Sequence, residues 1–170
     1  MGLHVSSAHG LPAFIDVEAS GLGRGSYPIE IGVCLPDGTS RCWLIRPAPL
    51  WRAWEPAAER IHRLSRDLLE RHGRPIRSVA EELNEVLAGQ VVYSDAWGND
   101  MPWVAALFDE AGLVQRFRIE ALRAIVPEVR LAEWNPMRKR IELELSLRRH
   151  RASADALALQ QTWAALCLPS

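Results

Sequence analysis

The stretch AFIDVE at residues 13–18 decides the fold class, because it is a short apolar run interrupted by two acidic residues. Such a run is typical of a strand, in which alternate side chains face opposite sides of a sheet. Asp16 and Glu18 are two residues apart, so we expect both carboxylates on the same face. A glycine-rich segment, residues 21–25, follows directly and indicates a loop at the end of this strand.

The rest of the chain continues this strand into an alternating pattern of elements. Apolar runs at residues 29–35 and 41–46 flank the turn signal PDGT and predict two more strands, antiparallel to the first. The remaining patterns predict helices at 55–61, 66–71, 78–87 (capped by Ser78), 101–111, 138–149 and 152–167, and strands at 90–93 and 116–120. This order predicts an α/β fold with a mixed sheet. Nothing divides residues 1–170, so we expect a single domain.

The composition is that of an ordinary globular protein, with 48% hydrophobic and 24% charged residues. The net charge of −1 gives no sign of nucleic-acid binding by itself. No apolar run is long enough to span a bilayer, and residues 1–12 lack the features of a secretory signal. Three cysteines are an odd number without metal-ligand spacing, which favours reduced thiols. We therefore expect a cytoplasmic protein without membrane association.

Acidic residues recur at both ends of the predicted domain. Two neighbouring carboxylates repel each other unless a cation lies between them, and hard oxygen ligands suit Mg²⁺ or Mn²⁺. Near the C-terminus, His150 and Asp155 stand on either side of the expected start of the last helix. Each feature alone has a simpler interpretation, such as solvated acids at a strand end or an acid favoured by the helix dipole. Their combination is more specific.

In these motifs the chain resembles the DEDDh 3′–5′ exonucleases, the DnaQ-like branch of the ribonuclease-H-like superfamily. Residues 14–22, followed by 28–33, are similar to the family's first exonuclease motif, and residues 150–156 are similar to its third. Residues 61–65 resemble the segment that leads toward the terminal nucleotide. The resemblance runs from about residue 13 to residue 166. It implies a ribonuclease-H-like sheet of three antiparallel strands and then parallel strands, flanked by helices.

The second family motif departs from its usual form. Residues 93–100 carry an insertion and lack the usual Phe before the aspartate, so both Asp95 and Asp100 are candidates. We choose Asp100 because it opens the predicted helix at 101–111, where the family ligand lies. The alternative for Asp100 is a simple N-cap.

The resemblance further implies a reaction and its participants. Two divalent cations, Mg²⁺ or Mn²⁺, would be held by Asp16, Glu18, Asp100 and Asp155, with His150 as general base. The substrate would be single-stranded DNA or the 3′ ends of DNA, and the products would be nucleoside 5′-monophosphates. The residues expected to contact substrate are Ala19, Ser20, Gly21, Leu22, His62, Trp97 and Arg151. Trp97 and Trp103 flank Asp100 and could stack on a terminal base, although for Trp103 we favour packing in the core.

Several alternatives stay open. The basic residues between 138 and 151 either hold phosphates or form a solvated helix face paired with Glu142 and Glu144. The enzyme would alternatively be a 3′–5′ exoribonuclease acting on RNA ends or short oligoribonucleotides, because no residue reveals a 2′-hydroxyl contact. A non-catalytic binding module with this fold is a different class of function, although it has no need of four acids and a histidine. A homodimer is also left open.

Overall fold

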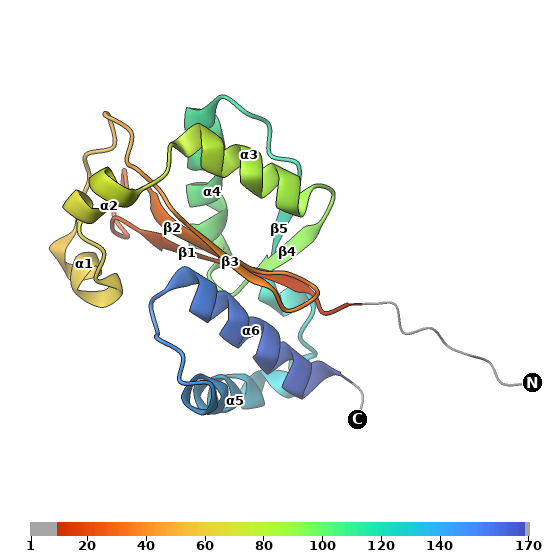
Figure 1. The fold of residues 1–170 in the computed structure, drawn as a ribbon. Coiled ribbons are helices and arrows are strands. Elements are labelled where there is room, and N and C mark those ends of the chain that lie inside the picture. The colour runs from red at the N-terminus through yellow and green to blue at the C-terminus, as the bar shows by residue number, and fades with distance from the viewer. Residues whose placement is uncertain (1–9, 169–170) are drawn as a thin grey trace, which may run out of the picture.

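Five strands form one central sheet in the computed structural model, which describes residues 10–168 (Figure 1). The strands are β1 (Ala13–Ala19), β2 (Pro28–Cys34), β3 (Ser40–Leu44), β4 (Val91–Ser94) and β5 (Arg118–Ala121). Their order across the sheet is β3-β2-β1-β4-β5. β1 and β3 are antiparallel to β2, whereas β4 is parallel to both β1 and β5. The predicted mixed sheet is confirmed.

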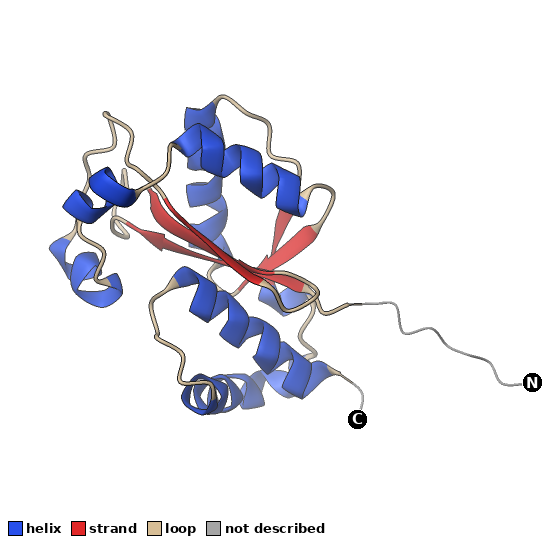
Figure 2. Cartoon of the chain, in the orientation of Figure 1, coloured by secondary structure: helices blue, strands red, loops and turns tan. Residues whose placement is uncertain are grey.

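Helices cover both faces of this sheet (Figure 2). The helices α3 (Ile76–Leu87) and α4 (Trp97–Ala111) lie on one face, and α5 (Leu131–Glu144) and α6 (Ala152–Cys167) lie on the other. Two short helices, α1 (Pro56–His62) and α2 (Arg66–His72), lie at one end of the sheet. Between residues 10 and 168, no helix is both long and apolar enough to cross a membrane. Residues 1–9, most of the segment assessed for a secretory signal, lie outside the described residues.

Strand β1 sends its side chains alternately to the two helical layers. Ile15 and Val17 belong to the apolar core that α3 and α4 complete. Phe14 belongs instead to the core beneath α6, with Leu159 of that helix. Since side chains two apart share a face, Asp16 and Glu18 lie on the α6 side with Phe14. The alternation therefore turns both acids toward the helix that carries Asp155.

A glycine in β2 lets α6 approach the sheet closely. Gly32 is the cross-strand partner of Asp16. A Cβ atom at Gly32 would lie 2.1 Å from the backbone carbon of Ala152 and from the backbone nitrogen of Ser153. Only a residue without a side chain fits at that distance, so Gly32 sets how near the first turn of α6 lies to β1.

Two predicted helix starts, those of α3 and α4, are wrong. Helix α3 begins at Ile76, directly after Pro75, so Ser78 lies within the helix and is not its cap. Helix α4 begins at Trp97, four residues before the predicted start, because the Ala96 carbonyl accepts the amide protons of Asn99 and Asp100. Asp100 is therefore a residue of the first turn.

Helix α5 is displaced relative to its prediction, since it spans Leu131–Glu144 rather than residues 138–149. It begins early because residues 131–137 add an apolar face that includes the buried Trp134. It ends early because Ser146 has a φ of 51°, which no α-helix accommodates. Residues 145–151 consequently form a loop that leads to α6. Helix α6 itself has the predicted bounds.

Candidate active site

Three carboxylates meet where β1 passes under the first turn of α6. Asp16, Glu18 and Asp155 each offer a ligand atom, and these atoms lie within 4.8 Å of one another. That spacing allows one cation to contact all three, and carboxylate oxygens are the ligands that Mg²⁺ and Mn²⁺ favour. These are the three acids that the first and third motifs predicted to bind metal. The structure thus contains a candidate metal site.

Asp155 is held in place by its own helix and by α5. Its Oδ2 accepts a hydrogen bond from the backbone amide of Arg151 at 3.1 Å, which closes the first turn of α6. Its Oδ1 lies 3.2 Å from Nη2 of Arg138. Arg138 also forms ion pairs with Glu142 and Asp95. The guanidinium therefore brings one positive charge to the edge of the acidic cluster.

Asp100 approaches the cluster from the opposite side, on the first turn of α4. The residue is fully buried, and its Oδ2 accepts a hydrogen bond from the Ser94 hydroxyl at 2.6 Å. Its Oδ1 is buried and has no hydrogen-bond partner within the described part of the chain. Such an orphaned carboxylate oxygen costs free energy unless a ligand or cation completes it. Together with the donor set, this oxygen fits a divalent cation.

Asp95, the other candidate for the second motif, lies in a different setting. It follows β4 directly and is paired with Arg138. It does not line the cavity onto which Asp100 faces. The insertion in the second motif therefore separates the two aspartates into an ion-paired acid and a cavity acid.

Burial raises the pKa values of all four carboxyls, and repulsion from neighbouring acids adds to the rise. The pKa of Asp16 is raised mainly because burial removes its carboxylate from water. Repulsion by the nearby acids raises it further, and these acids include Asp100, Asp155 and Glu18. The pKa of Glu18 rises to about 8, mainly through burial and then through Asp155. Burial raises the pKa of Asp100 to about 7, although the Ser94 hydroxyl opposes this.

The pKa of Asp155 is also raised by burial, against the lowering effect of Arg138. Raised pKa values mean that the folded protein disfavours four charges here without a counter-ion. A divalent cation would supply the missing positive charge.

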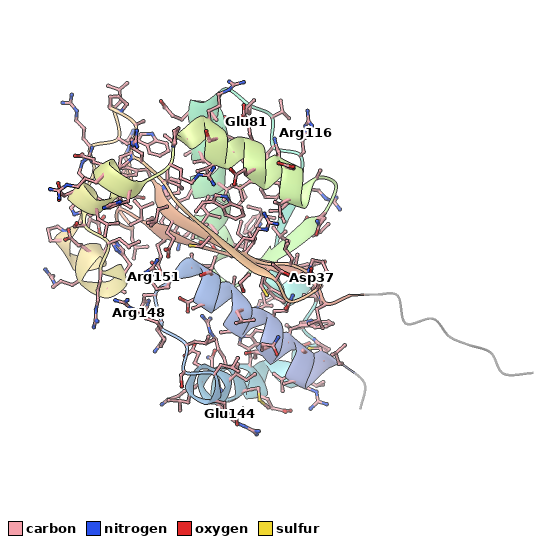
Figure 3. All side chains as sticks on the ribbon, in the orientation of Figure 1. Asp37, Glu81, Arg116, Glu144, Arg148 and Arg151 are labelled. Carbon is pink, nitrogen blue, oxygen red and sulfur yellow. The ribbon has the colours of Figure 1, made fainter. Side chains whose placement is uncertain are left out.

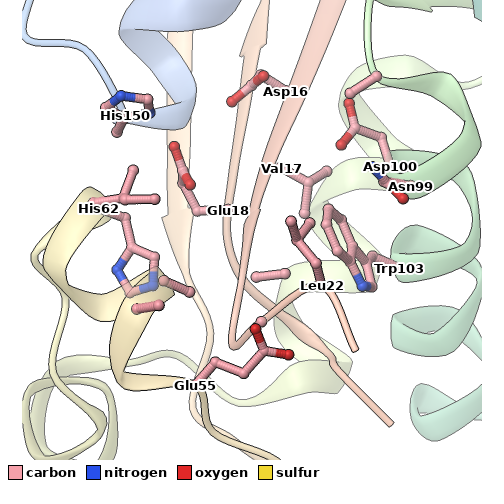
Figure 4. Close-up of a pocket in the computed structure, with 16 residues that line it drawn as sticks. Asp16, Val17, Glu18, Leu22, Glu55, His62, Asn99, Asp100, Trp103 and His150 are labelled. Atoms are coloured by element: carbon pink, nitrogen blue, oxygen red, sulfur yellow. The ribbon is translucent and has the colours of Figure 1, made fainter. Parts of the chain in front are cut away.

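A cavity of about 360 Å³ opens beside these carboxylates (Figure 4). One end of the cavity carries the carboxylates of Asp16, Glu18 and Asp100, and its middle is bordered by Leu22 and Trp103. The wall away from the acids is largely apolar. Its apolar lining residues are Val17, Ala19, Leu22, Ala57, Ala58, Ile61 and Trp103. The site therefore combines a charged end with an apolar pocket.

His150 lies at the charged end of this cavity, close to Glu18 (Figure 4). His150 directly precedes Arg151, the N-cap residue of α6, and its φ of 58° is left-handed. A left-handed conformation is uncommon for residues other than glycine. The loop thus presents the imidazole to the cavity through an unusual backbone turn.

The residues predicted to contact substrate are distributed unevenly. Ala19, Gly21, Leu22 and His62 line the cavity. Ser20 does not, because its buried hydroxyl accepts a hydrogen bond from the Tyr27 amide.

Trp97 also lies outside the cavity lining, because the helix starts at this residue and its indole donates to the Ile119 carbonyl at 2.9 Å. The guanidinium of Arg151 is bound to Glu30.

Several cavity residues were not among those expected to contact substrate. Trp103 packs partly against the core, as expected, but it also lines the cavity and donates a hydrogen bond to the Ser26 hydroxyl. Its position three residues after Asp100 on one helix was the available signal. Glu55 lines the far end, and its Oε1 accepts a hydrogen bond from the Gly23 amide at 2.7 Å. No local pattern marked Glu55, because the contact joins residues 32 apart.

Comparison with known proteins identifies the fold. No protein-family model and no curated protein matches this chain. Among solved structures, E. coli exonuclease I in complex with a dA16 oligonucleotide matches with a TM-score of 0.70 and 13% identity, over 93% of this chain and 41% of that one. The zinc-bound form of the E. coli exonuclease I complex with single-stranded DNA matches with a TM-score of 0.65 and 14% identity, over 93% and 40%. The chain thus spans about two fifths of these structures and has the ribonuclease-H-like fold.

Proposed function

We propose that this protein is a metal-dependent 3′–5′ exonuclease that acts on single-stranded DNA and releases nucleoside 5′-monophosphates. The observation that carries the proposal is the meeting of Asp16, Glu18 and Asp155 within 4.8 Å at the charged end of an apolar cavity. Asp100 and His150 face the same cavity. We also propose that residues 1–170 are one exonuclease domain.

In this proposal the four carboxylates hold the cations. Asp16, Glu18 and Asp155 form one group of ligands, and the free Oδ1 of Asp100 completes the set from α4. Divalent cations bound here would stabilise charge on the scissile phosphate and lower the pKa of the attacking water. The buried position of Asp100 keeps its carboxylate fixed, since Ser94 holds the other oxygen.

His150 acts as the general base. It accepts a proton from the attacking water, a task that suits an imidazole because its ordinary pKa lies near neutral pH. The loop at residues 145–151 delivers it to the cavity from the side opposite Asp100. The four acids remain ligands, so the base is a separate group.

The apolar part of the cavity receives the terminal nucleoside. Leu22 and Trp103 offer surfaces on which a base can stack, a contact that tolerates every base. A cavity of about 360 Å³ is within the size range of small-ligand sites, which suits one terminal nucleotide. This favours removal of one nucleotide at a time. The exonuclease I structures include complexes with dA16 and dT13, which favours DNA over RNA as the first substrate to test.

The test uses single-stranded DNA and RNA of one sequence, labelled at either end, with Mg²⁺ or Mn²⁺. The proposal predicts immediate release of labelled mononucleotide from 3′-labelled DNA and a shortening ladder from 5′-labelled DNA. Asp16→Asn should abolish both, whereas Asp109→Asn, an exposed acid near the end of α4, should not. Release beginning at the 5′ end, or activity that persists in Asp16→Asn, would contradict the proposal. Faster cleavage of RNA would assign the enzyme to the exoribonucleases instead.

A further inference from the structure

A second, smaller cavity adjoins the candidate active site. It measures about 230 Å³, and its lining comprises Ile61, His62, Arg63, Arg148, Arg149 and His150. Ile61, His62 and His150 belong to both cavities. The acidic residues Asp16, Glu18, Glu55 and Asp100 line the first cavity, whereas the second is lined by three arginines and no acid. Figure 3 shows Arg148 on the loop between α5 and α6, on the side of α1. The protein therefore places a basic cavity directly beside the acidic one.

Two of the lining residues have an unusual backbone conformation. Arg63 and His150 have φ values of 61° and 58°. Within residues 10–168, Ser146 is the only other residue besides glycine with a positive φ, and it belongs to the same loop as His150. A left-handed conformation favours glycine, yet these positions carry an arginine and a histidine. Arg63 caps the end of α1, and His150 lies near the end of the loop at residues 145–151. Both side chains border the second cavity.

His62 contributes a buried hydrogen-bond donor at the wall between the two cavities. Its Nδ1 accepts a hydrogen bond from the Leu64 amide at 3.0 Å, and burial lowers its pKa. The neutral ring therefore carries its proton on Nε2. This buried Nε2 has no hydrogen-bond partner in the described residues. The backbone carbonyl of Ala19 is near enough to oppose the lowering of the His62 pKa, but its geometry does not make a hydrogen bond with Nε2. An oxygen atom of a ligand would satisfy the donor.

The arginines are largely without acidic partners. Arg63 and Arg148 form no ion pair and no side-chain hydrogen bond within the described residues. Arg149 forms one ion pair, with Glu142 at 3.4 Å, and remains 65% exposed. The three arginines line one cavity with a single carboxylate partner among them, so positive charge on this cavity is largely uncompensated. An anion with several acceptor oxygens compensates that charge, and guanidinium groups bind phosphate through paired hydrogen bonds.

We propose that this basic cavity is a second phosphate site, which binds a phosphate of the substrate strand other than the one being cleaved. The inference rests on the proposed function, because the strand would reach the site through the shared residues His62 and His150. Arg63 and Arg148 supply charge, and Nε2 of His62 supplies one further donor. The phosphate is either the next phosphodiester upstream or a phosphate on the 3′ terminus. Both have the same chemistry.

The experiment compares binding of three dinucleotides to the full chain in excess chelator, where no cleavage takes place. They are dTpdT, pdTpdT with a 5′-phosphate, and dTpdTp with a 3′-phosphate. We expect one phosphorylated form to bind wild type about tenfold more tightly than dTpdT, as one or two charge-assisted hydrogen bonds would give. Preference for pdTpdT would identify the upstream phosphate, and preference for dTpdTp the terminal one.

Variants then assign the effect to the cavity. Arg63→Gly removes a guanidinium and relieves the left-handed φ, so it should fold at least as well as wild type while losing the preference. Arg148→Ala should also lose the preference for the phosphorylated dinucleotide. Arg148 does not have a left-handed backbone, so this loss would come from the missing guanidinium alone. Arg116→Ala, an exposed arginine beside the far end of α3, is the control and should keep the preference (Figure 3).

Equal binding of all three dinucleotides by wild type would overturn the second site, and so would a preference that survives in both variants. Metal-dependent cleavage of labelled strands alongside either result would leave the proposed function standing. Failure both to cleave strands and to bind any dinucleotide would instead overturn the two proposals together.

Discussion

Arg151 binds the buried carboxylate of Glu30 through two of its nitrogens, with Nη2 at 2.6 Å and Nε at 3.0 Å from Oε1. The other oxygen of Glu30 accepts a hydrogen bond from the Ala152 amide at 2.8 Å. Glu30 is fully buried on β2, opposite Glu18 of β1. Because Arg151 follows His150 directly, this one carboxylate attaches the end of the loop and the start of α6 to the sheet.

Loss of the Glu30 charge should therefore loosen the active site. Glu30→Gln keeps the shape of the side chain but leaves Arg151 without its counter-charge, and we expect a loss of about 2 kcal/mol in the free energy of unfolding. Turnover should fall more than tenfold because His150 and Asp155 lose their shared anchor. Urea unfolding and nuclease assays measure both effects.

The control for Glu30 is Glu144→Gln, which breaks the exposed ion pair with Arg140 and should change the unfolding free energy by less than about 0.5 kcal/mol. Equal stability and activity in the two variants would show that the buried pair does not position the site.

Close approach of α6 to β2 leads to a second prediction. Gly32→Ala would place a methyl group 2.1 Å from backbone atoms of Ala152 and Ser153, which cannot move aside as a side chain would. We expect a loss of about 3 kcal/mol and weaker Mn²⁺ binding, since Asp155 must shift. The same substitution at Gly98, in the first turn of α4, meets no atom within 4 Å and should be neutral or stabilising. Thermal unfolding of both variants gives the comparison, and a stable Gly32→Ala that binds Mn²⁺ normally would contradict it.

The second-motif aspartates should behave oppositely. Asp100→Ala removes the cavity carboxylate with the orphaned Oδ1, so catalysis should be lost. Asp95→Ala removes one of three acidic partners of Arg138 and should leave most of the activity. Circular dichroism checks that both variants fold. A dead Asp95→Ala beside an active Asp100→Ala would reverse the assignment of the second motif.

The raised carboxyl pKa values predict how stability depends on pH without metal. A carboxyl whose pKa is higher in the folded state retains a proton that the unfolded chain releases, so stability declines as pH rises from the ordinary range to the folded-state pKa. For Glu18 this interval runs from about 4.5 to about 8. In chelator, the melting temperature should fall between pH 5 and pH 8, and Glu18→Gln should weaken that fall.

Added Mn²⁺ should raise the melting temperature by an amount that grows with pH over the same interval, because binding requires the ionised carboxylates. An increment that is constant from pH 5 to pH 8 would contradict the raised pKa values.

Sequence patterns predicted what depends on neighbouring residues along the chain. The two-residue period of β1 placed Asp16 and Glu18 on one face, and the apolar run of α6 gave its bounds. Contacts between distant residues had no such signal. The pair of Glu30 with Arg151 joins residues 121 apart, and no local pattern indicated that Arg151, which was predicted to contact substrate, also anchors the start of α6 to the sheet. The early start of α4 and the early end of α5 likewise depend on backbone hydrogen bonds and on a left-handed Ser146, which propensities do not report.

The final prediction separates the general base from the metal ligands. His150→Ala should bind Mn²⁺ nearly as well as wild type, because Asp16, Glu18 and Asp155 form the ligand group without the imidazole. Its turnover should fall by about 10²–10⁴-fold, the usual contribution of a positioned base. Asp155→Ala should lose both Mn²⁺ binding and turnover, since it removes a ligand. His72→Ala, an exposed histidine at the end of α2, should change neither. Calorimetric Mn²⁺ titration and single-turnover cleavage measure the two properties, and wild-type turnover in His150→Ala would exclude the histidine as the base.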